Sequence, residues 1–352
     1  MLYLEITILS LAVLAEHRYC VVIQECPKLH KLLLTLDPMT LIKLTSLSCG
    51  YEGVYPKVCC TEEKMSHRND YNDQNDVTNY RDVMSFNDLI PTSNMVRHIH
   101  GGIATFLQEF PWMALLEYDT PEGMKTSCGG ALINHRYVLT AAHCVSDKIL
   151  PEDWSLTGVR LGEYNTATDM DCTVFGDSGL ICNKHITVGI EKSILHENYN
   201  TYNHQSDIAL IRLSRDVAFT DYIKPISLPS GPYIQKKLTV AGWGRTESGI
   251  SSEILLKVTL PLVDRELCSE KYQVQMLESQ ICVGGMKGTD SCKGDSGGPL
   301  VQLVKSPYTN LKKWEIVGIV SYGNRMCGTE GWPGVYTKVY SYVPWILSKI
   351  GE

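Results

Sequence analysis

Three short segments of this 352-residue chain hold residues that together could transfer an acyl group. The segments are Thr140-Ala141-Ala142-His143-Cys144, Asp207-Ile208-Ala209-Leu210 and Gly294-Asp295-Ser296-Gly297-Gly298-Pro299. Acyl transfer by serine needs a base for the hydroxyl proton, a buried carboxylate that fixes the tautomer of this base, and donors for the oxyanion. We therefore predict that Ser296 is a nucleophile, His143 its base and Asp207 the orienting carboxylate.

The glycines around Ser296 fit the same chemistry. Because glycine allows a tight backbone turn, the N–H groups of Gly294 and Ser296 can both point at a developing negative charge. A histidine, or an aspartate before an apolar run, is weak evidence when taken alone. The hexapeptide around Ser296 combined with both upstream segments is far more specific.

The positions of these residues are set by a series of short apolar runs separated by turn residues, which begins at Ile99. Such spacing favours antiparallel sheets and barrels over alternating strand–helix units. Only Tyr342 to Ile350 has a clear helical pattern in this part of the chain. The runs are Trp112–Tyr118, Gly130–Thr140, Asp207–Leu213, Leu238–Trp243, Ile316–Tyr322 and Gly334–Val339.

The bulk composition excludes some functions. A net charge of -7 leaves no basic surface for nucleic acid or anionic lipid, and a mean hydropathy of -0.09 argues against several membrane spans. The 13 cysteines fall into two groups, from Cys20 to Cys60 and from Cys128 to Cys327, which predicts paired thiols in an oxidising compartment. Residues 1–15 are apolar enough for a signal peptide, although Glu5 interrupts the run and no basic residue precedes it.

The region before Ile99 divides in two. Residues 16–60 are rich in cysteine and contain one predicted helix, around Pro27 to Leu36. Residues 61–98 differ sharply, because their run from Asn69 to Asp76 is polar and acidic and holds too few aliphatic side chains to offset the entropy of ordering. We interpret residues 61–98 as an exposed linker and activation region. The alternative is a long loop inside one domain, which is uncommon in compact domains.

From Ile99 onward the chain resembles the trypsin/chymotrypsin family nearly end to end. The resemblance also rests on Phe110-Pro111-Trp112, Cys128-Gly129-Gly130, Ala241-Gly242-Trp243-Gly244 and Gly334-Val335-Tyr336-Thr337. It implies an all-β fold for residues 99–352, with two six-stranded antiparallel barrels and a C-terminal helix. It also implies a serine endopeptidase that requires no cofactor for catalysis. The implied disulfides are Cys128–Cys144, Cys268–Cys282 and Cys292–Cys327.

Asp290 lies six residues before Ser296, where the family has the floor of its primary specificity pocket. Gly323 and Gly334 match the pocket walls, and Ser321 and Gly323 would hydrogen-bond an extended substrate through their backbones. A carboxylate at the end of a deep slot pairs with a guanidinium or ammonium group, so the resemblance implies cleavage after Arg or Lys. The alternative is a solvated surface aspartate.

The resemblance further implies an inactive precursor. Ile99-His100-Gly101-Gly102 matches the start of the mature family chain, whose new amino group pairs with the aspartate beside the catalytic serine, here Asp295. The residue before this cut is His98 instead of the usual Arg or Lys, so a protease specific for basic residues should cut there poorly. Cleavage after Arg97 is the alternative, but it would place His98 where the family has an aliphatic side chain.

Ser227 replaces a cysteine that many relatives bond to the linker. Its absence predicts that residues 16–60 are released from the protease region after the cut. Retention by non-covalent packing is the alternative.

Residues 16–60 are similar to the clip domain of arthropod proteases. The similarity rests on Cys20 to Pro27, Cys49-Gly50 and Pro56-Lys57-Val58-Cys59-Cys60. The clip domain has six cysteines and this segment has five. The family pattern implies the pairs Cys20–Cys49 and Cys26–Cys60 and leaves Cys59 alone. Either the true N-terminus differs from the one given, or Cys59 is free or bonded to another chain.

Two further features between residues 163 and 182 match clip proteases. Cys172 and Cys182 match an extra bridge of those proteases. Glu163, with Asp169 and Asp171 nearby, resembles the calcium loop of the family. Oxygen-rich loops suit calcium, so Glu163 is the expected ligand of a structural calcium ion. An acidic solvated loop is the alternative.

Together the two resemblances identify the chain as a member of the arthropod clip-domain serine proteases, and the non-basic His98 is similar to persephone-like members. They imply a secreted protease of the haemolymph that acts in a Toll or melanisation cascade. The implied partners are a protein substrate (a downstream zymogen or cytokine precursor), an upstream activating protease and a serpin inhibitor, but neither nucleic acid nor a membrane. The alternatives are a venom or digestive protease, and a binding cofactor whose clip domain docks partners while catalysis is incidental.

Overall fold

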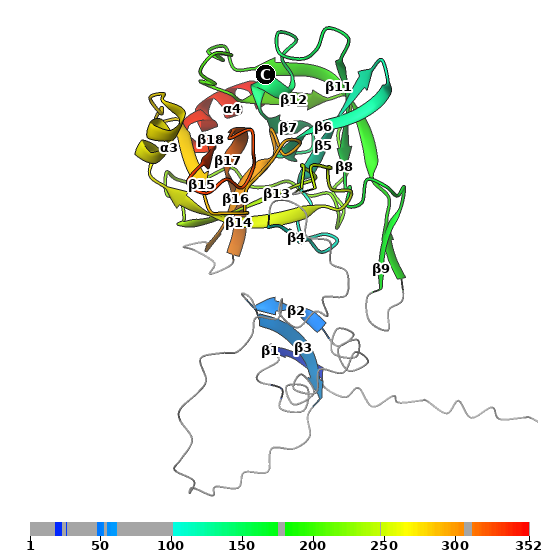
Figure 1. Ribbon diagram of the computed structural model, residues 1–352. Coiled ribbons are helices and arrows are strands. Elements are labelled where there is room, and N and C mark those ends of the chain that lie inside the picture. The colour runs from blue at the N-terminus through cyan, green and yellow to red at the C-terminus, as the bar shows by residue number, and fades with distance from the viewer. Residues whose placement is uncertain are drawn as a thin grey trace, which may run out of the picture. The chain divides into compact units, whose positions relative to one another are not determined.

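Antiparallel strands are the main regular elements of the described residues, as the short apolar runs predict (Figure 1). The computed structural model describes residues 18–22, 26, 48–52, 55–61, 101–174, 180–246, 248–305 and 312–351. The chain divides into two compact units, of which one holds residues 1–95 and 172–181 and the other residues 96–171 and 182–352.

A closed six-stranded barrel forms the first half of the larger unit, with the strand order β11-β12-β7-β6-β5-β8. Apolar residues fill its interior, and Ala114, Leu116 and Tyr118 of β5 have no exposed surface. Burial of this apolar surface is the main stabilising term for such a barrel. The strands are β5 (Met113–Thr120), β6 (Gly123–Leu132), β7 (Tyr137–Thr140), β8 (Ser155–Leu161), β11 (Ile186–Leu195) and β12 (Ala209–Leu213).

The predicted run Gly130–Thr140 is not one strand but the end of β6, a turn, and β7. The turn is made by Asn134, whose Oδ1 accepts hydrogen bonds from the N–H groups of Arg136 and Tyr137, each at 2.8 Å. Asparagine stabilises turns in this way because its side chain bonds to the backbone two residues on. The turn brings β7 antiparallel to β6, with Ala131 opposite Leu139.

The second barrel has the strand order β13-β16-β17-β18-β15-β14, and pairing of β13 with β14 closes it. Its core includes Leu238, Val240, Leu260 and Leu300, each at most 1% exposed. The chain therefore has the two six-stranded barrels that the sequence predicts. In the second barrel the short strand β4 pairs with the free edge of β14. The strands are β4 (Ile103–Ala104), β13 (Lys237–Gly242), β14 (Leu256–Val263), β15 (Gln280–Gly284), β16 (Pro299–Lys305), β17 (Lys312–Tyr322) and β18 (Pro333–Lys338).

The predicted C-terminal helix is present as α4 (Val343–Ile350), preceded by the 3-10 turn η5 (Val339–Tyr342). A second helix, α3 (Arg265–Tyr272), was not predicted. Its one buried residue is Cys268, which is bonded to Cys282 of β15. Because a disulfide replaces an apolar stripe in attaching α3, the sequence shows no helical periodicity there.

The smaller unit contains a three-stranded antiparallel sheet with the order β1-β3-β2. Its strands are β1 (Arg18–Val22), β2 (Ser48–Glu52) and β3 (Tyr55–Thr61), and Cys20 lies opposite Cys59 in the register. Cys26 is buried and disulfide-bonded. The side chains of Cys20, Cys49, Cys59 and Cys60, the predicted helix from Pro27 to Leu36, residues 1–15 and the linker beyond Thr61 lie outside the described residues.

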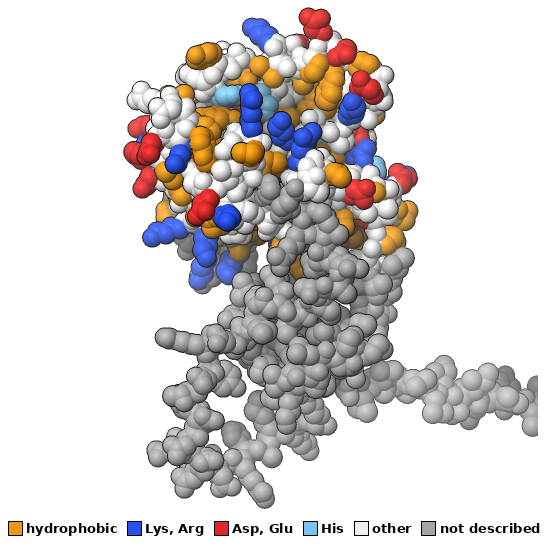
Figure 2. Space-filling view, viewed as in Figure 1, with side chains coloured by type: hydrophobic (Ala, Val, Ile, Leu, Met, Phe, Trp, Pro, Cys, Tyr) orange, Lys and Arg blue, Asp and Glu red, His pale blue; other side chains and the backbone are white. Residues whose placement is uncertain are grey.

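All three disulfides predicted for the protease region are present, namely Cys128–Cys144, Cys268–Cys282 and Cys292–Cys327. Cys172 and Cys182 also form disulfide bonds, and they lie on the paired strands β9 (Asp171–Val174) and β10 (Leu180–Asn183). Among the described helices, none has the length and apolar character of a membrane span. Figure 2 shows basic, acidic and apolar side chains interspersed over the described part of one face.

Candidate active site

The structure joins His143 to Asp207 at the edge of the first barrel. His143 lies in the 3-10 turn η3 (Ala142–Cys144), directly after β7, and Asp207 lies two residues before β12. The Nδ1 atom of His143 is 2.8 Å from Asp207 Oδ2, and the backbone N–H of His143 donates to Asp207 Oδ1 at 3.0 Å. This arrangement orients the imidazole and leaves its Nε2 side for proton transfer.

Asp207 has a third donor that the sequence did not reveal. The hydroxyl of Ser321 donates to Asp207 Oδ2 at 2.5 Å, and the side chain of Asp207 is fully buried. Burial by itself would raise the pKa of Asp207, but His143 and the hydrogen bonds hold it below its ordinary value. Asp207 therefore stays ionised, which the orienting role requires. Ser321 was predicted only as a backbone contact to substrate.

The loop that carries Ser296 is attached to both barrels. The N–H of Gly129 in β6 donates to the carbonyl of Ser296 at 2.8 Å, and the N–H of Gly297 donates to Val320 of β17 at 2.9 Å. Gly297 has a φ of 76°, and a Cβ there would lie 2.6 Å from the carbonyl oxygen of Gly129, so only glycine fits. No hydrogen bond joins Ser296 to His143 among the described residues; in free enzymes such bonds commonly tighten only when substrate binds.

The predicted oxyanion donors lie in a tight turn beside Ser296. The N–H of Asp295 donates to Cys292 at 3.0 Å and that of Gly298 donates to Asp295 at 2.9 Å. Within the described chain, the N–H groups of Gly294 and Ser296 donate to no protein acceptor. Two free donors beside a nucleophile are what a developing oxyanion needs.

A cavity of about 210 Å³ lies next to Ser296, and Asp290 forms part of its wall. Asp290 is only 3% exposed, and its Oδ1 atom has no hydrogen-bond partner among the described residues. Its Oδ2 atom accepts the N–H of Gly328 at 3.1 Å. Burial raises the pKa of Asp290 to about 6. A buried carboxylate oxygen that lacks a donor is poised to bind a cationic group that enters the cavity.

The other predicted pocket residues surround the same cavity. Ser321, Gly323 and Gly334 line it, and a Cβ at Gly334 would lie only 3.7 Å from Asp290 Oδ1. Glycine at 334 therefore leaves room for a long side chain above the carboxylate. The sequence did not reveal that Ser291 also contributes a hydroxyl, which lies 2.9 Å from the hydroxyl of Tyr336.

Asp295 is completely buried behind the oxyanion turn. Its two oxygens accept the N–H groups of Gly244 at 2.8 Å and of Cys292 at 2.9 Å. A Cβ at Gly242 or Gly244 would overlap its carboxylate. Among the described residues Asp295 has no cationic partner, and burial raises its pKa to about 6. Asp295 is thus a buried carboxyl group without a compensating positive charge among the described residues, and Gly242 and Gly244 leave the space that it occupies.

No sequence pattern singled out His204, which lies beside the catalytic histidine. Its ring meets His143 edge-on, with 6.4 Å between ring centroids, and stacks on Tyr322 at 4.8 Å. Burial lowers the pKa of His204, so it is neutral when His143 acts as a base. His204 and Tyr322 therefore form an aromatic wall next to the catalytic dyad.

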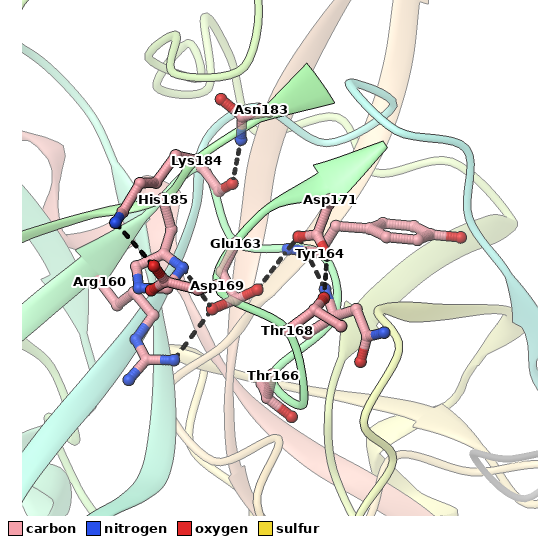
Figure 3. Close-up of polar contacts among 12 residues, drawn as sticks. Arg160, Glu163, Tyr164, Thr166, Thr168, Asp169, Asp171, Asn183, Lys184 and His185 are labelled. Atoms are coloured by element: carbon pink, nitrogen blue, oxygen red, sulfur yellow. Dashed lines mark hydrogen bonds and ion pairs between the residues drawn. The ribbon is translucent and has the colours of Figure 1, made fainter. Parts of the chain in front are cut away.

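Glu163, the predicted calcium ligand, has protein partners on both carboxylate oxygens (Figure 3). Its Oε2 atom lies 3.0 Å from Arg160 Nη1 and 3.2 Å from His185 Nδ1. Its Oε1 atom accepts the N–H of Tyr164 at 2.8 Å. Calcium takes six to eight oxygen ligands, whereas the groups that surround this buried carboxylate include a guanidinium and an imidazole.

The other carboxylates of this loop are also occupied by protein donors. Asp171 accepts the N–H groups of Tyr164 and Asn165 and the hydroxyl of Thr168. Asp169 pairs with Lys184 at 2.7 Å (Figure 3). The residues in this arrangement therefore do not fit a calcium ion at Glu163, and the expectation from the sequence is left to a binding test.

We expect the melting temperature of the enzyme to be the same in calcium and in a chelator, because Arg160, His185 and the N–H of Tyr164 already occupy both oxygens of Glu163. Glu163→Gln should destabilise the fold by about 2 kcal/mol, because it replaces the charged acceptor of the Arg160 hydrogen bond with a neutral amide. Differential scanning fluorimetry measures both effects. A rise of several degrees in calcium that Glu163→Gln abolishes would show instead that the ion displaces Arg160.

Comparison with family models covers both units of the chain. Residues 99–346 match the model described as Trypsin, and residues 17–60 match the model described as the regulatory CLIP domain of proteinases. His143, Asp207, Ser296 and Asp290 all lie within the first match. The two matches together span most of the chain.

Curated relatives resemble the chain over nearly its whole length. It is 42% identical over 346 residues to the CLIP domain-containing serine protease HP8 of Bombyx mori, covering 95% of this chain and 91% of the relative. It is 40% identical over 362 residues to the Spaetzle-processing enzyme of Drosophila melanogaster, covering 95% and 89% respectively.

A solved structure shares the fold. The crystal structure of the Drosophila Grass clip serine protease of the Toll pathway is 33% identical in sequence, with a TM-score of 0.65. The similarity covers 95% of this chain and 94% of that protein.

Proposed function

Since this chain belongs to the trypsin family of serine endopeptidases and carries a CLIP domain, we propose that it is a secreted zymogen that cleaves a protein substrate after Arg or Lys in an arthropod immune cascade. One observation carries the specificity. Within the described part of the chain the Oδ1 atom of Asp290 has no hydrogen-bond partner, and Asp290 lines the same cavity as Ser296. A guanidinium or ammonium group of the substrate would satisfy this oxygen.

The place in a cascade is supported by the relatives. One of them is named a Spaetzle-processing enzyme and the similar crystal structure is assigned to the Toll pathway. The substrate of this chain is then a downstream zymogen or cytokine precursor, its activator an upstream protease and its inhibitor a serpin. Melanisation is the other cascade in which we expect it. The disulfide bonds of the described residues support secretion, with the haemolymph as the site of action.

We propose that cleavage of the His98–Ile99 bond activates the enzyme. The buried carboxyl group of Asp295 has no cation among the described residues, and the new amino group of Ile99 would compensate it. Such a pair would stabilise the turn that holds Gly294 and Ser296, so the switch is an ion pair created by proteolysis. Because His98 is a poor substrate for a pocket that contains Asp290, a second protease must make the cut.

The test replaces residues 95–98 with an enteropeptidase site and cuts the purified zymogen before Ile99. We expect hydrolysis of P1-Arg and P1-Lys peptides to rise on the order of 10³-fold after the cut, because the oxyanion donors become ordered. P1-Phe peptides should stay poor substrates. Initial rates on chromogenic peptides, before and after the cut, give the result.

Two variants serve as controls. Ser296→Ala sets the blank, and Asp295→Asn should fold and be cut but stay inactive, because its neutral amide cannot pair with the new amine. Labelling of Ser296 with a fluorophosphonate separates an enzyme from a binding cofactor. Cut, folded protein that neither labels nor hydrolyses any peptide would refute the proposed activity and leave binding by the CLIP domain as the function.

A further inference from the structure

Two basic side chains line the cavity that holds Asp290. Lys293 lies three residues before Ser296, and Arg325 lies two residues after Gly323. Both are exposed, whereas Asp290 is 3% exposed. The difference in exposure places Asp290 at the floor of the cavity and both cations at its mouth. The cavity therefore combines a negative floor with a positive mouth.

The charges at the mouth are not compensated by an ion pair with any described residue. Neither Lys293 nor Arg325 forms an ion pair with a described residue, whereas the exposed cations Lys184 and Lys224 pair with aspartates at 2.7 and 2.9 Å. A third basic residue, Arg245, donates its N–H to the carbonyl of Lys293 at 2.7 Å and is also exposed. A substrate side chain thus passes Lys293 and Arg325, which we call the cationic rim, before it reaches Asp290.

We propose that Lys293 and Arg325 select substrates that carry an acidic residue within the three positions before the scissile Arg or Lys. This inference rests on the proposed function, because it requires a peptide bound along Ser321 and Gly323 with its basic side chain on Asp290. The residues that precede the scissile bond then pass over the cavity mouth. An acidic side chain there is attracted by both cations, and a basic one is repelled.

The expected size of the preference for an acidic residue follows from the solvent exposure of Lys293 and Arg325. Each contact between solvent-exposed charges changes affinity by at most a few fold, so two cations together should favour glutamate over lysine by about tenfold. Salt screens such contacts strongly. The rim therefore sets a preference among substrates of the primary pocket, and Asp290 still decides which residue is cleaved.

A second cavity near the catalytic serine carries the opposite charge. It has a volume of about 240 Å³, adjoins the oxyanion residue Gly294 and is lined by the exposed acid Glu253. A substrate residue that enters this second cavity would meet a negative charge. A peptide probe with a constant leaving group removes that contribution and isolates the upstream positions.

The experiment uses the cut full-length enzyme and coumarin peptides of the form X-Ala-Ala-Arg, Ala-X-Ala-Arg and Ala-Ala-X-Arg, in which X is Glu, Ala or Lys. We expect kcat/KM to be about tenfold higher for Glu than for Lys in at least one series at about 20 mM salt, and the ratio to fall toward 1 at about 500 mM salt. In Lys293→Gln/Arg325→Gln the ratio should be near 1 at both salt concentrations. The matched control Lys305→Gln/Lys312→Gln removes two exposed lysines from the paired ends of β16 and β17 and should keep the ratio of the parent enzyme.

The outcomes separate this inference from the function on which it rests. Cleavage of P1-Arg peptides with equal rates for Glu and Lys in all three series overturns the inference alone. A glutamate preference that persists in Lys293→Gln/Arg325→Gln also overturns it. Failure of the cut, folded enzyme to cleave any P1-Arg peptide overturns the proposed function and the inference together.

Discussion

Asp207→Asn should reduce kcat on the order of 10⁴-fold and change KM little, which is the loss that this substitution causes in serine proteases with this triad. Asp207 accepts hydrogen bonds from the N–H of His143, from His143 Nδ1 and from the Ser321 hydroxyl on its two oxygens. Asparagine offers one acceptor oxygen and an NH₂ group, so it favours the imidazole tautomer that carries its proton on Nε2. That tautomer cannot take the proton of Ser296. Steady-state kinetics of the cut enzyme on a P1-Arg peptide measure the loss.

A second aspartate supplies a matched control. Asp171 is 6% exposed and, like Asp207, accepts both N–H and hydroxyl donors, but it lies in the loop that begins at Glu163. Asp171→Asn should leave kcat within about threefold of the parent, since surface-loop substitutions away from the chemistry act mainly on stability. If Asp207→Asn kept more than a tenth of the parent kcat, the triad assignment would be wrong.

Asp290→Ser should lower kcat/KM for P1-Arg peptides on the order of 10³-fold, because it leaves the substrate cation unpaired in a buried cavity. The same variant should cleave P1-Leu peptides at least as well as the parent. The ratio of the two kcat/KM values reports specificity without any contribution from the triad. Asp221→Ser removes an exposed carboxylate that pairs with Lys224, and as the control it should leave this ratio unchanged.

The ratio of kcat/KM for P1-Arg peptides to kcat/KM for P1-Leu peptides should also depend on pH. Burial raises the pKa of Asp290 to about 6, so the carboxyl group of the free enzyme takes up a proton as the pH falls through 6 and loses its attraction for a cation. The preference for Arg over Leu should therefore be largest above pH 7 and decline below pH 6. The effects of pH on the catalytic steps that both substrates share cancel in the ratio. A preference that stays constant from pH 8 to pH 5 would show that Asp290 does not bind the substrate cation.

The sequence by itself determined the chemistry, because this chemistry depends on residue types within short segments. The hexapeptide around Ser296 needs glycine at 297, where φ is positive and a Cβ would meet Gly129, so the requirement is visible in the sequence. The short apolar runs predicted antiparallel sheets or barrels, whereas the two six-stranded barrels and the disulfide pairs were implied by the family resemblance. The turn at Asn134 was not predicted, because the apolar run Gly130–Thr140 that it divides looks continuous in the sequence.

The tertiary structure decided which partners those residues have. The hydroxyl of Ser321 reaches Asp207 across 114 positions of sequence, and only the packing of one barrel against the other brings them together. The acidic loop at Glu163 looked like a calcium site because the sequence does not show that His185, 22 positions further on, lies with its Nδ1 atom 3.2 Å from Glu163 Oε2. The cationic rim was invisible for the same reason. Lys293 and Arg325 lie 32 positions apart, and an electrostatic field depends on distances in space, which only the fold sets.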